Sequence, residues 1–315
     1  MTGYIVRRLL ALIPLLLIIS FLVFAMSFLI PGDPARTLAG GLHATPDSVA
    51  KVRHQLGFDQ PILVQYWHWL TNALHGDLGQ SLFKKTSVAS EIHRRFPVTF
   101  SMAIGALALM IVLGIPAGIV AGTHPGGTMD RLVTLGTSTA IAIPDFWLGI
   151  ILVIVFAVNL KWLPAIGYVP FTDSPLQWAR HLILPWIGLG LAGAAPIARQ
   201  LRGALIDVLD QDYIRTAGAK GLPRWRVIYK HALKNAAIAP VTIIGIQFAY
   251  LLGGTVIFEY IFSIPGLGQY FLTGLSERDL PVIQGVTLVI ALTFVLLNLL
   301  VDILYVYLNP KVRLT

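Results

Sequence analysis

The sequence predicts an all-α, polytopic membrane protein with six transmembrane helices and both termini in the cytoplasm. Hydrophobic residues make up 56% of the 315-residue chain, and charged residues make up only 12%. Soluble domains carry about 25% charged residues, so this chain lacks the charged surface that a soluble protein needs. The mean hydropathy of +0.76 agrees with this class. Long uncharged runs, separated by polar segments, give the predicted helices.

Each predicted span is an apolar run close to, or longer than, the roughly 20 residues that cross a bilayer. The first run follows Arg7 and Arg8 and exceeds the 7–15 apolar residues, roughly, of a signal peptide, so we interpret it as a retained span. A turn at 124–127 ends the second run, and Pro144 followed by Asp145 interrupts the third. The runs are Leu9–Ile30, Phe96–Met129, Leu132–Leu160, His181–Ala198, Asn235–Phe258 and Leu280–Val301.

Basic residues predict the orientation, because cytoplasmic loops carry an excess of Lys and Arg. With both termini inside, the short outer loops carry only Lys161, Arg180 and Arg278, and the inner segments carry many more basic residues. The segment 31–95 is also basic, but long segments are translocated largely regardless of charge. We therefore expect three parts: a first helix (1–30), an external insertion (31–95), and a five-helix core (96–315) with a cytoplasmic loop at 203–235.

Several functional classes conflict with the composition. The net charge of +8 comes from loops between apolar runs, and this distribution argues against a nucleic-acid partner. The absence of cysteine excludes disulfides, thiolate zinc sites and a cysteine nucleophile. The eight histidines show no metal-binding spacing of the His-Glu-x-x-His kind. We expect no metal, no cofactor and no catalytic residue on this chain, with the lipid bilayer as its surroundings.

Three glycines recur every four residues in the second predicted helix. Gly114, Gly118 and Gly122 share one face, with Pro116 between the first two. Small residues at this interval let helix backbones approach closely in lipid. We favour a static helix contact over a moving hinge.

The predicted inner loop contains a small-residue segment between basic residues. From Arg199 to Ala236 there are eight basic residues against three acidic ones. Asp212 can cap a helix through Tyr213–Lys220, and Gly221 can end that helix with a positive φ. The short side chains let a soluble partner reach the backbone, although a basic loop lying against lipid headgroups has the same composition. The small residues are Thr216, Ala217, Gly218 and Ala219.

The pattern Asp-Tyr-x-Arg-Thr-Ala-x-Ala-Lys-Gly-Leu at Asp212–Leu222 resembles the coupling loop, or EAA loop, of bacterial ABC-importer permeases. The resemblance is to the dipeptide, oligopeptide and nickel group of these permeases. Gly218 stands where the group usually has Arg, and Asn309 where it usually has Asp. Further matches follow in order along the whole chain: Pro31–Pro34, Gly76–Ser81, Trp162–Pro164, His231–Ala236, Pro240, Phe262–Gly268, Arg278–Pro281, Asn298, Asp302, Tyr305 and Asn309–Lys311.

The resemblance implies a type I importer permease fold, MetI-like, with an external insertion after the first helix. It implies a bacterial plasma-membrane permease subunit that moves di- or oligopeptides by alternating access. The expected partners are a second homologous permease, two ABC ATPases and an extracytoplasmic substrate-binding protein. ATP and Mg would bind the ATPases, because this chain has no Gly-x4-Gly-Lys-Ser/Thr motif and so is no ATPase itself. The expected ATPase-coupling residues are Asp212, Tyr213, Arg215, Thr216, Ala217, Gly218, Ala219, Lys220 and Gly221.

Polar residues at membrane depth are further candidates, because they are costly in lipid. Asp145 can line the pathway, or cap the helix that restarts after Pro144, and we favour the cap. Glu259 can belong to a gate, with Gly253 and Gly254 allowing a bend, but a glutamate at a span end is more often solvated. The loop between the last two spans can meet the binding protein, or be a plain turn; its candidates are Phe262, Pro265 and Gly266.

Other functions stay open from the sequence. A nickel or other small-solute importer of the same group is the nearest alternative, although no intramembrane cluster of His or acidic residues supports it. A self-sufficient secondary transporter often has paired broken helices, and the sequence shows a single break, at Pro144. An intramembrane protease needs a nucleophile or metal motif, which is not evident. The cargo, the cargo-contacting residues and whether the second permease is a copy of this chain do not follow from the sequence.

Overall fold

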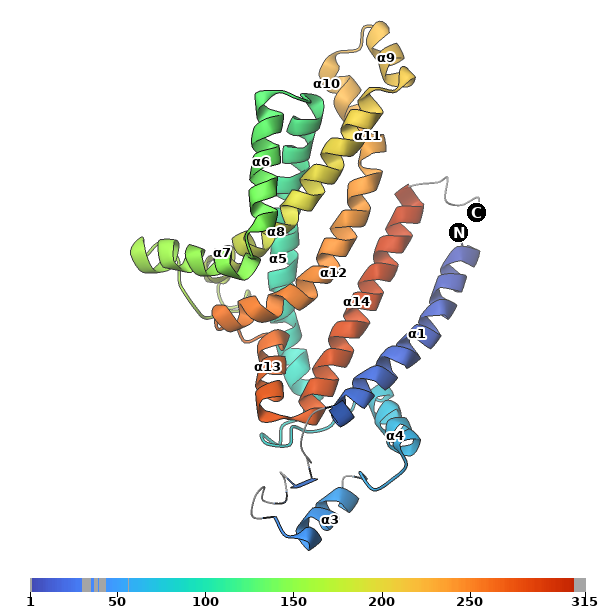
Figure 1. Ribbon diagram of the computed structural model, residues 1–315, viewed down its shortest axis with the longest axis vertical. Helices are drawn as coiled ribbons and strands as arrows, with labels where there is room; N and C mark the ends of the chain where they lie inside the picture. Colours follow the sequence, from blue (N-terminus) through green and yellow to red (C-terminus); the bar gives the residue numbers. More distant parts are fainter. Residues whose placement is uncertain (1, 30–34, 37–38, 40–43, 56, 309–315) are drawn as a thin grey trace. The chain divides into compact units, whose positions relative to one another are not determined.

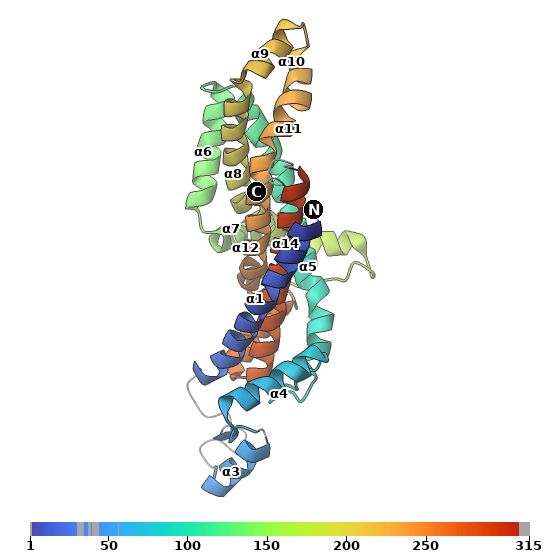
Figure 2. The same cartoon turned by 90° about the vertical axis from the view of Figure 1, so that its right-hand side faces the viewer.

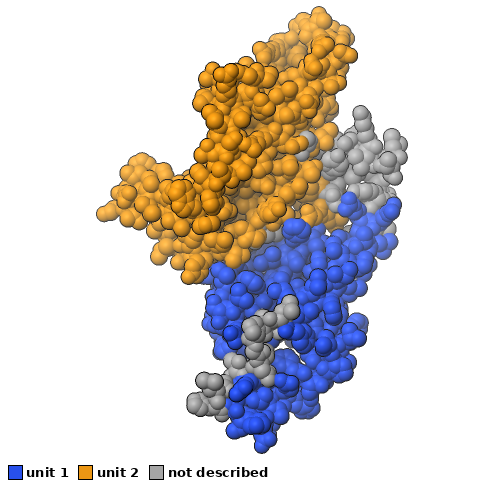
Figure 3. Space-filling view, viewed as in Figure 1, with its two compact units in different colours: residues 1–97, 266–295 blue, residues 98–265, 296–315 orange. Residues whose placement is uncertain are grey.

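The computed structural model describes residues 2–29, 35–36, 39, 44–55 and 57–308, and the regular structure in these ranges is helical (Figure 1). Their only extended pairing is an isolated bridge between Gln80 and Ser87. The chain divides into two compact units, coloured separately in Figure 3. The first unit comprises residues 1–97 with 266–295, and the second comprises 98–265 with 296–315.

The long helix α8 is the central element of the second unit. It packs against α6, α7, α9, α11 and α12 (Figures 1 and 2). Ser174 begins α8 by accepting a hydrogen bond from the Gln177 amide, and Pro175 occupies its first position. The helices are α5 (Val88–Thr123), α6 (Thr128–Ala142), α7 (Asp145–Leu152), the π-helical η2 (Val153–Asn159), α8 (Pro175–Leu209), α9 (Asp212–Ala219), α10 (Arg224–Arg226), the π-helical η3 (Val227–Ala232), α11 (Leu233–Ala236) and α12 (Ile238–Ile261).

The glycine repeat of α5 forms a close contact with α8, which confirms the predicted packing role. A Cβ atom on Gly114 would lie 2.8 Å from the Ala194 carbonyl oxygen, and one on Gly118 would lie 2.8 Å from that of Ala198. A Cβ on Gly122 would lie 2.8 Å from the Leu205 Cβ. Real Cβ atoms do not occupy such positions, so this approach of the two backbones requires glycine.

The third predicted span is not one continuous membrane helix. Helix α6 ends at Ala142, and the α6 and α7–η2 axes differ by 97°. Ile143 has an extended backbone, and Pro144 lacks the N–H that would continue the ladder. A second bend of 58° separates Arg224–Ala236 from Pro240–Leu251, so the expectation of a single broken span was wrong.

Where they are described, the six predicted runs are mostly helical, but the described helices do not give six straight spans. Three helices are long and apolar enough to cross a membrane: Val88–Thr123, Pro175–Leu209 and Leu280–Val301. The two bent pairs raise this to as many as five, and α1 contributes a shorter apolar helix, Leu10–Met26. The six-span count and the cytoplasmic position of both termini stay predictions.

The first unit brings together sequence motifs about 200 residues apart. Ser81 Oγ donates to Asp279 Oδ2 at 2.5 Å, and the Leu82 amide donates to Asp279 Oδ1 at 3.2 Å. Arg95 lies over the ring of Tyr270, whose pKa is raised to about 12 by burial and by the charges of Asp279 and Glu91. The helices are α1 (Thr2–Leu29), α3 (Pro46–Gln55), α4 (Ile62–Leu74), α13 (Leu267–Glu277), and the first parts of α5 and α14 (Leu280–Leu308).

The predicted external insertion falls in this unit. Its helix α4 packs on α1, where Tyr66 Oη and Ser20 Oγ are 2.8 Å apart and the rings of Phe24 and Tyr66 lie 5.6 Å apart. Pro31–Pro34 and Asn309–Lys311 lie outside the described residues. The boundaries predicted at residues 30 and 95 stay predictions, because the compact units group the chain differently.

We expect Gly118→Ala to lower the stability of the full chain by about 1–3 kcal/mol, because the added methyl group overpacks the α5–α8 contact. The matched control is Gly136→Ala in α6, where a Cβ has nothing within 4 Å. This control should be neutral or slightly stabilising, because alanine favours the helix. Thermal unfolding of both purified variants in the same detergent gives the comparison. Equal midpoints for the two variants would contradict the close-contact account.

Candidate functional site

The predicted coupling segment contains a short helix with well-defined ends. Helix α9 begins at Asp212 after the N-cap residue Gln211, so the expectation that Asp212 caps this helix was wrong by one position. Asp212 lies in the first turn, where its carboxylate interacts favourably with the positive end of the helix dipole. Gly221 has a φ of +78° just after the C-cap Lys220, which confirms the predicted helix-ending glycine.

One face of α9 belongs to an apolar core of the second unit. Ile214 is 7% exposed and Ala217 is 8% exposed. They pack with side chains from α8 and from the helices that follow α9. Ala217 is therefore small because it fits against its own chain, and the expectation that it offers a free surface to a partner was wrong. The other buried members of this core are Leu201, Leu205, Val227, Ala232 and Ala236.

The opposite face of α9 is open to solvent. Gly218, four residues after Ile214, lies at the edge of the buried face and is exposed; a Cβ there would meet nothing within 4 Å, so this position tolerates a contact from outside. Arg215 forms an ion pair with Asp210 at 2.6 Å between exposed side chains, which contributes little to stability. Tyr213 is held by Asn235, whose Nδ2 donates to its hydroxyl at 2.9 Å. The exposed predicted residues are Asp212, Tyr213, Arg215, Thr216, Gly218, Ala219, Lys220 and Gly221.

A mostly apolar hollow of about 360 Å³ lies beside α9. Gly218 lines it from α9, Leu209 from the end of α8, and Val227 from η3. Apolar hollows bordered by few polar groups accept a side chain from another molecule. The complete lining is Leu209, Ile214, Gly218, Leu222, Arg224, Val227 and Ile228.

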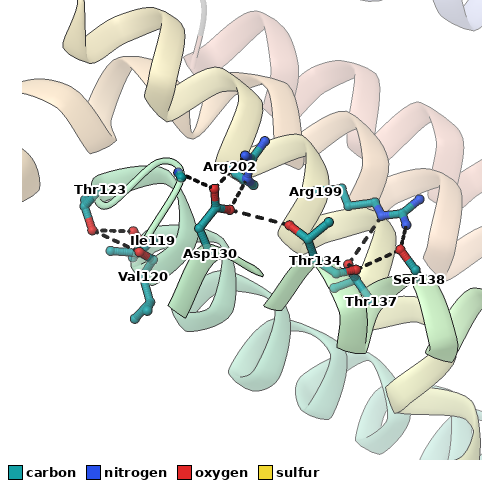
Figure 4. A network of polar contacts seen from close by, with 10 residues as sticks. Ile119, Val120, Thr123, Asp130, Thr134, Thr137, Ser138, Arg199 and Arg202 are labelled. Carbon is teal, nitrogen blue, oxygen red and sulfur yellow. Dashed lines mark hydrogen bonds and ion pairs between the residues drawn. The ribbon is translucent and has the colours of Figure 1, made fainter. Parts of the chain in front are cut away.

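A polar network ties α6 to α8 near the coupling segment (Figure 4). The Asp130 carboxylate is 3% exposed and forms a two-pronged ion pair with Arg202, with Nη2 to Oδ2 at 2.8 Å. The Gly126 amide donates to the same carboxylate at 2.8 Å. Arg199 Nη2 also donates to Ser138 Oγ at 2.6 Å. Arg199 and Arg202 of α8 therefore both bind side chains of α6. From the sequence, basic residues in this region indicated only the orientation of the chain in the membrane.

The segment after α9 is tied to the end of α5. Arg224 Nη2 donates to the Thr123 carbonyl oxygen at 2.9 Å. The coupling segment is thus linked to α5 by this bond and to α8 by the apolar core. Sequence reasoning missed Asp130, Arg202 and Arg224 as a structural group. The detectable signal was the isolated acid, Asp130, at the end of a long uncharged run.

The predicted intramembrane acids lie in different surroundings from those expected. Asp145 occupies the first turn of α7 rather than its cap, which is Pro144, and its Oδ1 accepts from the Phe146 amide at 2.7 Å. Glu259 is 0% exposed and accepts a hydrogen bond from Thr99 Oγ1 at 2.7 Å. The expectation of a solvated Glu259 was wrong. This carboxylate fixes the end of α12 against α5.

The remaining predicted residues lie near the end of α12. Helix α12 is continuous through Gly253 and Gly254, and a Cβ on Gly253 would meet nothing within 4 Å. Phe262 is buried and stacks with Phe258 at 6.0 Å. Gly266 is also buried, so among the three predicted binding-protein contacts only Pro265 is exposed. In the described part of the chain, no group of three His, Cys, Asp or Glu residues is placed to hold a metal ion.

Comparison with known proteins covers nearly the whole chain. Residues 114–314 match the family described as the binding-protein-dependent transport system inner membrane component, and residues 1–103 match the N-terminal region of such membrane components. The chain is 44% identical over 313 residues to a protein of Brucella abortus (strain 2308) named as a peptide transport system permease. It is equally similar to the glutathione transport system permease protein GsiC of Escherichia coli (strain K12). Each pairing covers 99% of both chains.

The fold of this chain resembles that of a solved structure. A chain of the MetNI methionine ABC transporter, in an inward-facing form, superposes with a TM-score of 0.57 at 21% sequence identity. The superposition covers 70% of this chain and 96% of that chain. This likeness shows a MetI-like fold.

We expect Arg202→Gln to lower the unfolding temperature of the full chain, because it leaves the Asp130 carboxylate without its charge partner. The double variant Asp130→Asn with Arg202→Gln should unfold at a higher temperature than Arg202→Gln alone, because it removes the unpaired charge. Thermal unfolding of Arg202→Gln, Asp130→Asn and the double variant tests this coupling. Strictly additive losses would show that the two residues act independently.

Proposed function

The chain belongs to the family of binding-protein-dependent transport system inner membrane components, a multi-pass protein of the bacterial inner membrane, and we propose that it imports di- or oligopeptides. In this proposal it is the permease subunit of an ATP-binding-cassette importer. Two ATPase subunits, a second homologous permease and an external substrate-binding protein complete the transporter. ATP and Mg bind to the ATPases.

The observation that carries the proposal is the two-faced coupling helix. Ile214 and Ala217 build one face of α9 into the core with α8; Thr216 and Ala219 are exposed on the other face, and Gly218 is exposed at the edge between them. Because α9 and α8 share this core, a partner that binds the exposed part of α9 and moves it also moves α8. The hollow beside Gly218 gives such a partner a place to insert an apolar side chain.

The proposed transport mechanism is alternating access, and the packing of α9 on α8 supports it by linking the exposed helix to the membrane helices. In the proposed cycle, ATP closes the ATPase pair and shifts both coupling helices, so that the pathway opens toward the binding protein. Hydrolysis releases the pair, and the pathway opens to the cytoplasm. A ligand shifts such an equilibrium only by its different affinity for the two states, so the loaded binding protein must prefer the outward-open state.

Peptide cargo is favoured by the names of two relatives, a peptide and a glutathione transport permease. Nickel is the second candidate on group resemblance, but within the described residues no cluster of His and acidic side chains offers ligands for a metal ion. A self-sufficient secondary transporter gains one argument from the two bent helix pairs. The family membership outweighs it, because members of this family work with a binding protein.

We expect Gly218→Trp to reduce substrate-stimulated ATP hydrolysis by roughly tenfold, because a bulky side chain on the open face blocks the docked partner at a cost of about 1–3 kcal/mol. A Cβ there has nothing within 4 Å, and the unfolding temperature of the variant is measured beside the ATPase rate to show that it is folded. Gly136→Trp, equally open but on α6, is the matched control and should keep normal stimulation. The measurement is ATPase rate in the reconstituted transporter, and full stimulation in Gly218→Trp would refute docking on this face.

The cargo is tested separately with the same reconstituted transporter. Binding protein loaded with dipeptides, tripeptides, glutathione or Ni²⁺ is added, and uptake into vesicles is measured together with ATP hydrolysis. The proposal predicts that one or more peptides stimulate both activities and that Ni²⁺ does not. Stimulation by Ni²⁺ alone would replace the peptide assignment and leave the coupling mechanism standing.

A further inference from the structure

The helical segment Arg224–Asn235 has one face that no described element of the second unit covers. Trp225 is 60% exposed and Tyr229 is 58% exposed, although both are large aromatic side chains. Val227 and Ala232 of the same segment are buried in the apolar core with α8 and α9. Trp225 and Tyr229 therefore face away from the core, on an exposed side of the segment.

Three basic side chains share this exposed side. Arg226, Lys230 and Lys234 are all exposed, and no described carboxylate lies within ion-pair distance of any of them. The Arg226 guanidinium lies over the Trp225 ring, with Cζ 5.3 Å from the ring centre. The acids of the preceding loop are engaged elsewhere, as Asp210 pairs with Arg215. The face thus combines positive charge with aromatic rings.

The segment Arg224–Asn235 adjoins two apolar helices. Arg224 is hydrogen-bonded to the carbonyl of Thr123, the last residue of the candidate span Val88–Thr123. Beyond the segment, the apolar stretch Pro240–Leu251 begins. The segment therefore joins a polar helix to an apolar stretch, and its first residue is bonded to the end of an apolar helix. Aromatic rings and basic side chains are enriched where such apolar stretches of membrane proteins begin and end.

We propose that this face, formed by Trp225, Arg226, Tyr229, Lys230 and Lys234, binds the headgroups of anionic phospholipids. The amphipathic rings lie among the headgroups and upper acyl chains, and the three cations pair with lipid phosphates. Anionic lipid is favoured over a protein partner because the charges are of one sign and the aromatic rings stand beside them. The proposal goes beyond the transport function and does not depend on the cargo.

Brominated lipids test the proposal directly, because bromine quenches nearby tryptophan fluorescence. The transporter is purified through a tag on this chain and placed in nanodiscs of phosphatidylglycerol and phosphatidylcholine, with only one of the two lipids brominated. Subtracting the signal of Trp225→Phe isolates Trp225 from the other tryptophans. We expect brominated phosphatidylglycerol to quench Trp225 more strongly than brominated phosphatidylcholine at the same bromine content.

The charge dependence has a matched control. The triple variant Arg226→Gln, Lys230→Gln and Lys234→Gln should lose the preference for phosphatidylglycerol, since each basic residue near an anionic surface contributes roughly fivefold to binding. The control triple variant Lys51→Gln, Lys84→Gln and Lys161→Gln removes three exposed charges elsewhere and should keep the preference. Equal quenching by both lipids overturns the proposal. So does the absence of lipid quenching at Trp225, which would indicate a protein partner on this face.

Discussion

The close contact between α5 and α8 is the constraint on which the rest of the second unit depends. Gly114, Gly118 and Gly122 place the α5 backbone directly against the α8 backbone, at separations where a methyl group has no room. In a membrane there is little hydrophobic force to hold helices together, so such packing contacts carry much of the stability. Because α8 also packs on α6, α7, α9 and α12, the glycine contact positions α5 relative to all of them. The polar side chains that pair between α6 and α8, such as Asp130 and Arg202, are therefore held close to each other.

The coupling segment is continuous with this packed unit. Ile214 and Ala217 anchor α9 to α8, and Arg224 anchors the next segment to the end of α5. The Asp130–Arg202 pair holds α6 to α8 on the same part of the unit. In the proposed mechanism, these packed side chains and buried polar contacts transmit a force from the exposed part of α9 to α8, α5 and α6. Packed cores change between discrete arrangements instead of deforming smoothly, which suits a subunit driven by a two-state motor.

The sequence predicted features that depend on local pattern. Apolar runs located the helices, the four-residue glycine spacing located the α5 contact face, and Gly221 marked the end of α9. It did not predict features that depend on which elements meet. Ala217 has the small side chain expected of a docking surface, but the fold turns it toward Leu201 and Leu205. Glu259 was expected in solvent because it ends an apolar run, yet Thr99 meets it from a helix 160 positions away in sequence. Asp130 and Arg202 are 72 residues apart in sequence, so only the fold reveals that they pair.

The central claim is that α9 moves with α8 as one body during the transport cycle, and a distance measurement tests it most directly. Because the chain has no cysteine, Gly218→Cys on α9 and Gln200→Cys on α8 allow two spin labels to be attached to otherwise unlabelled protein. Pulsed electron resonance in the reconstituted transporter then gives the distance between the labels with ATP bound and with ADP bound. The account predicts the same narrow distance distribution in both states. A shift or a broadening between the two states would show that α9 moves independently of α8, and would contradict the account.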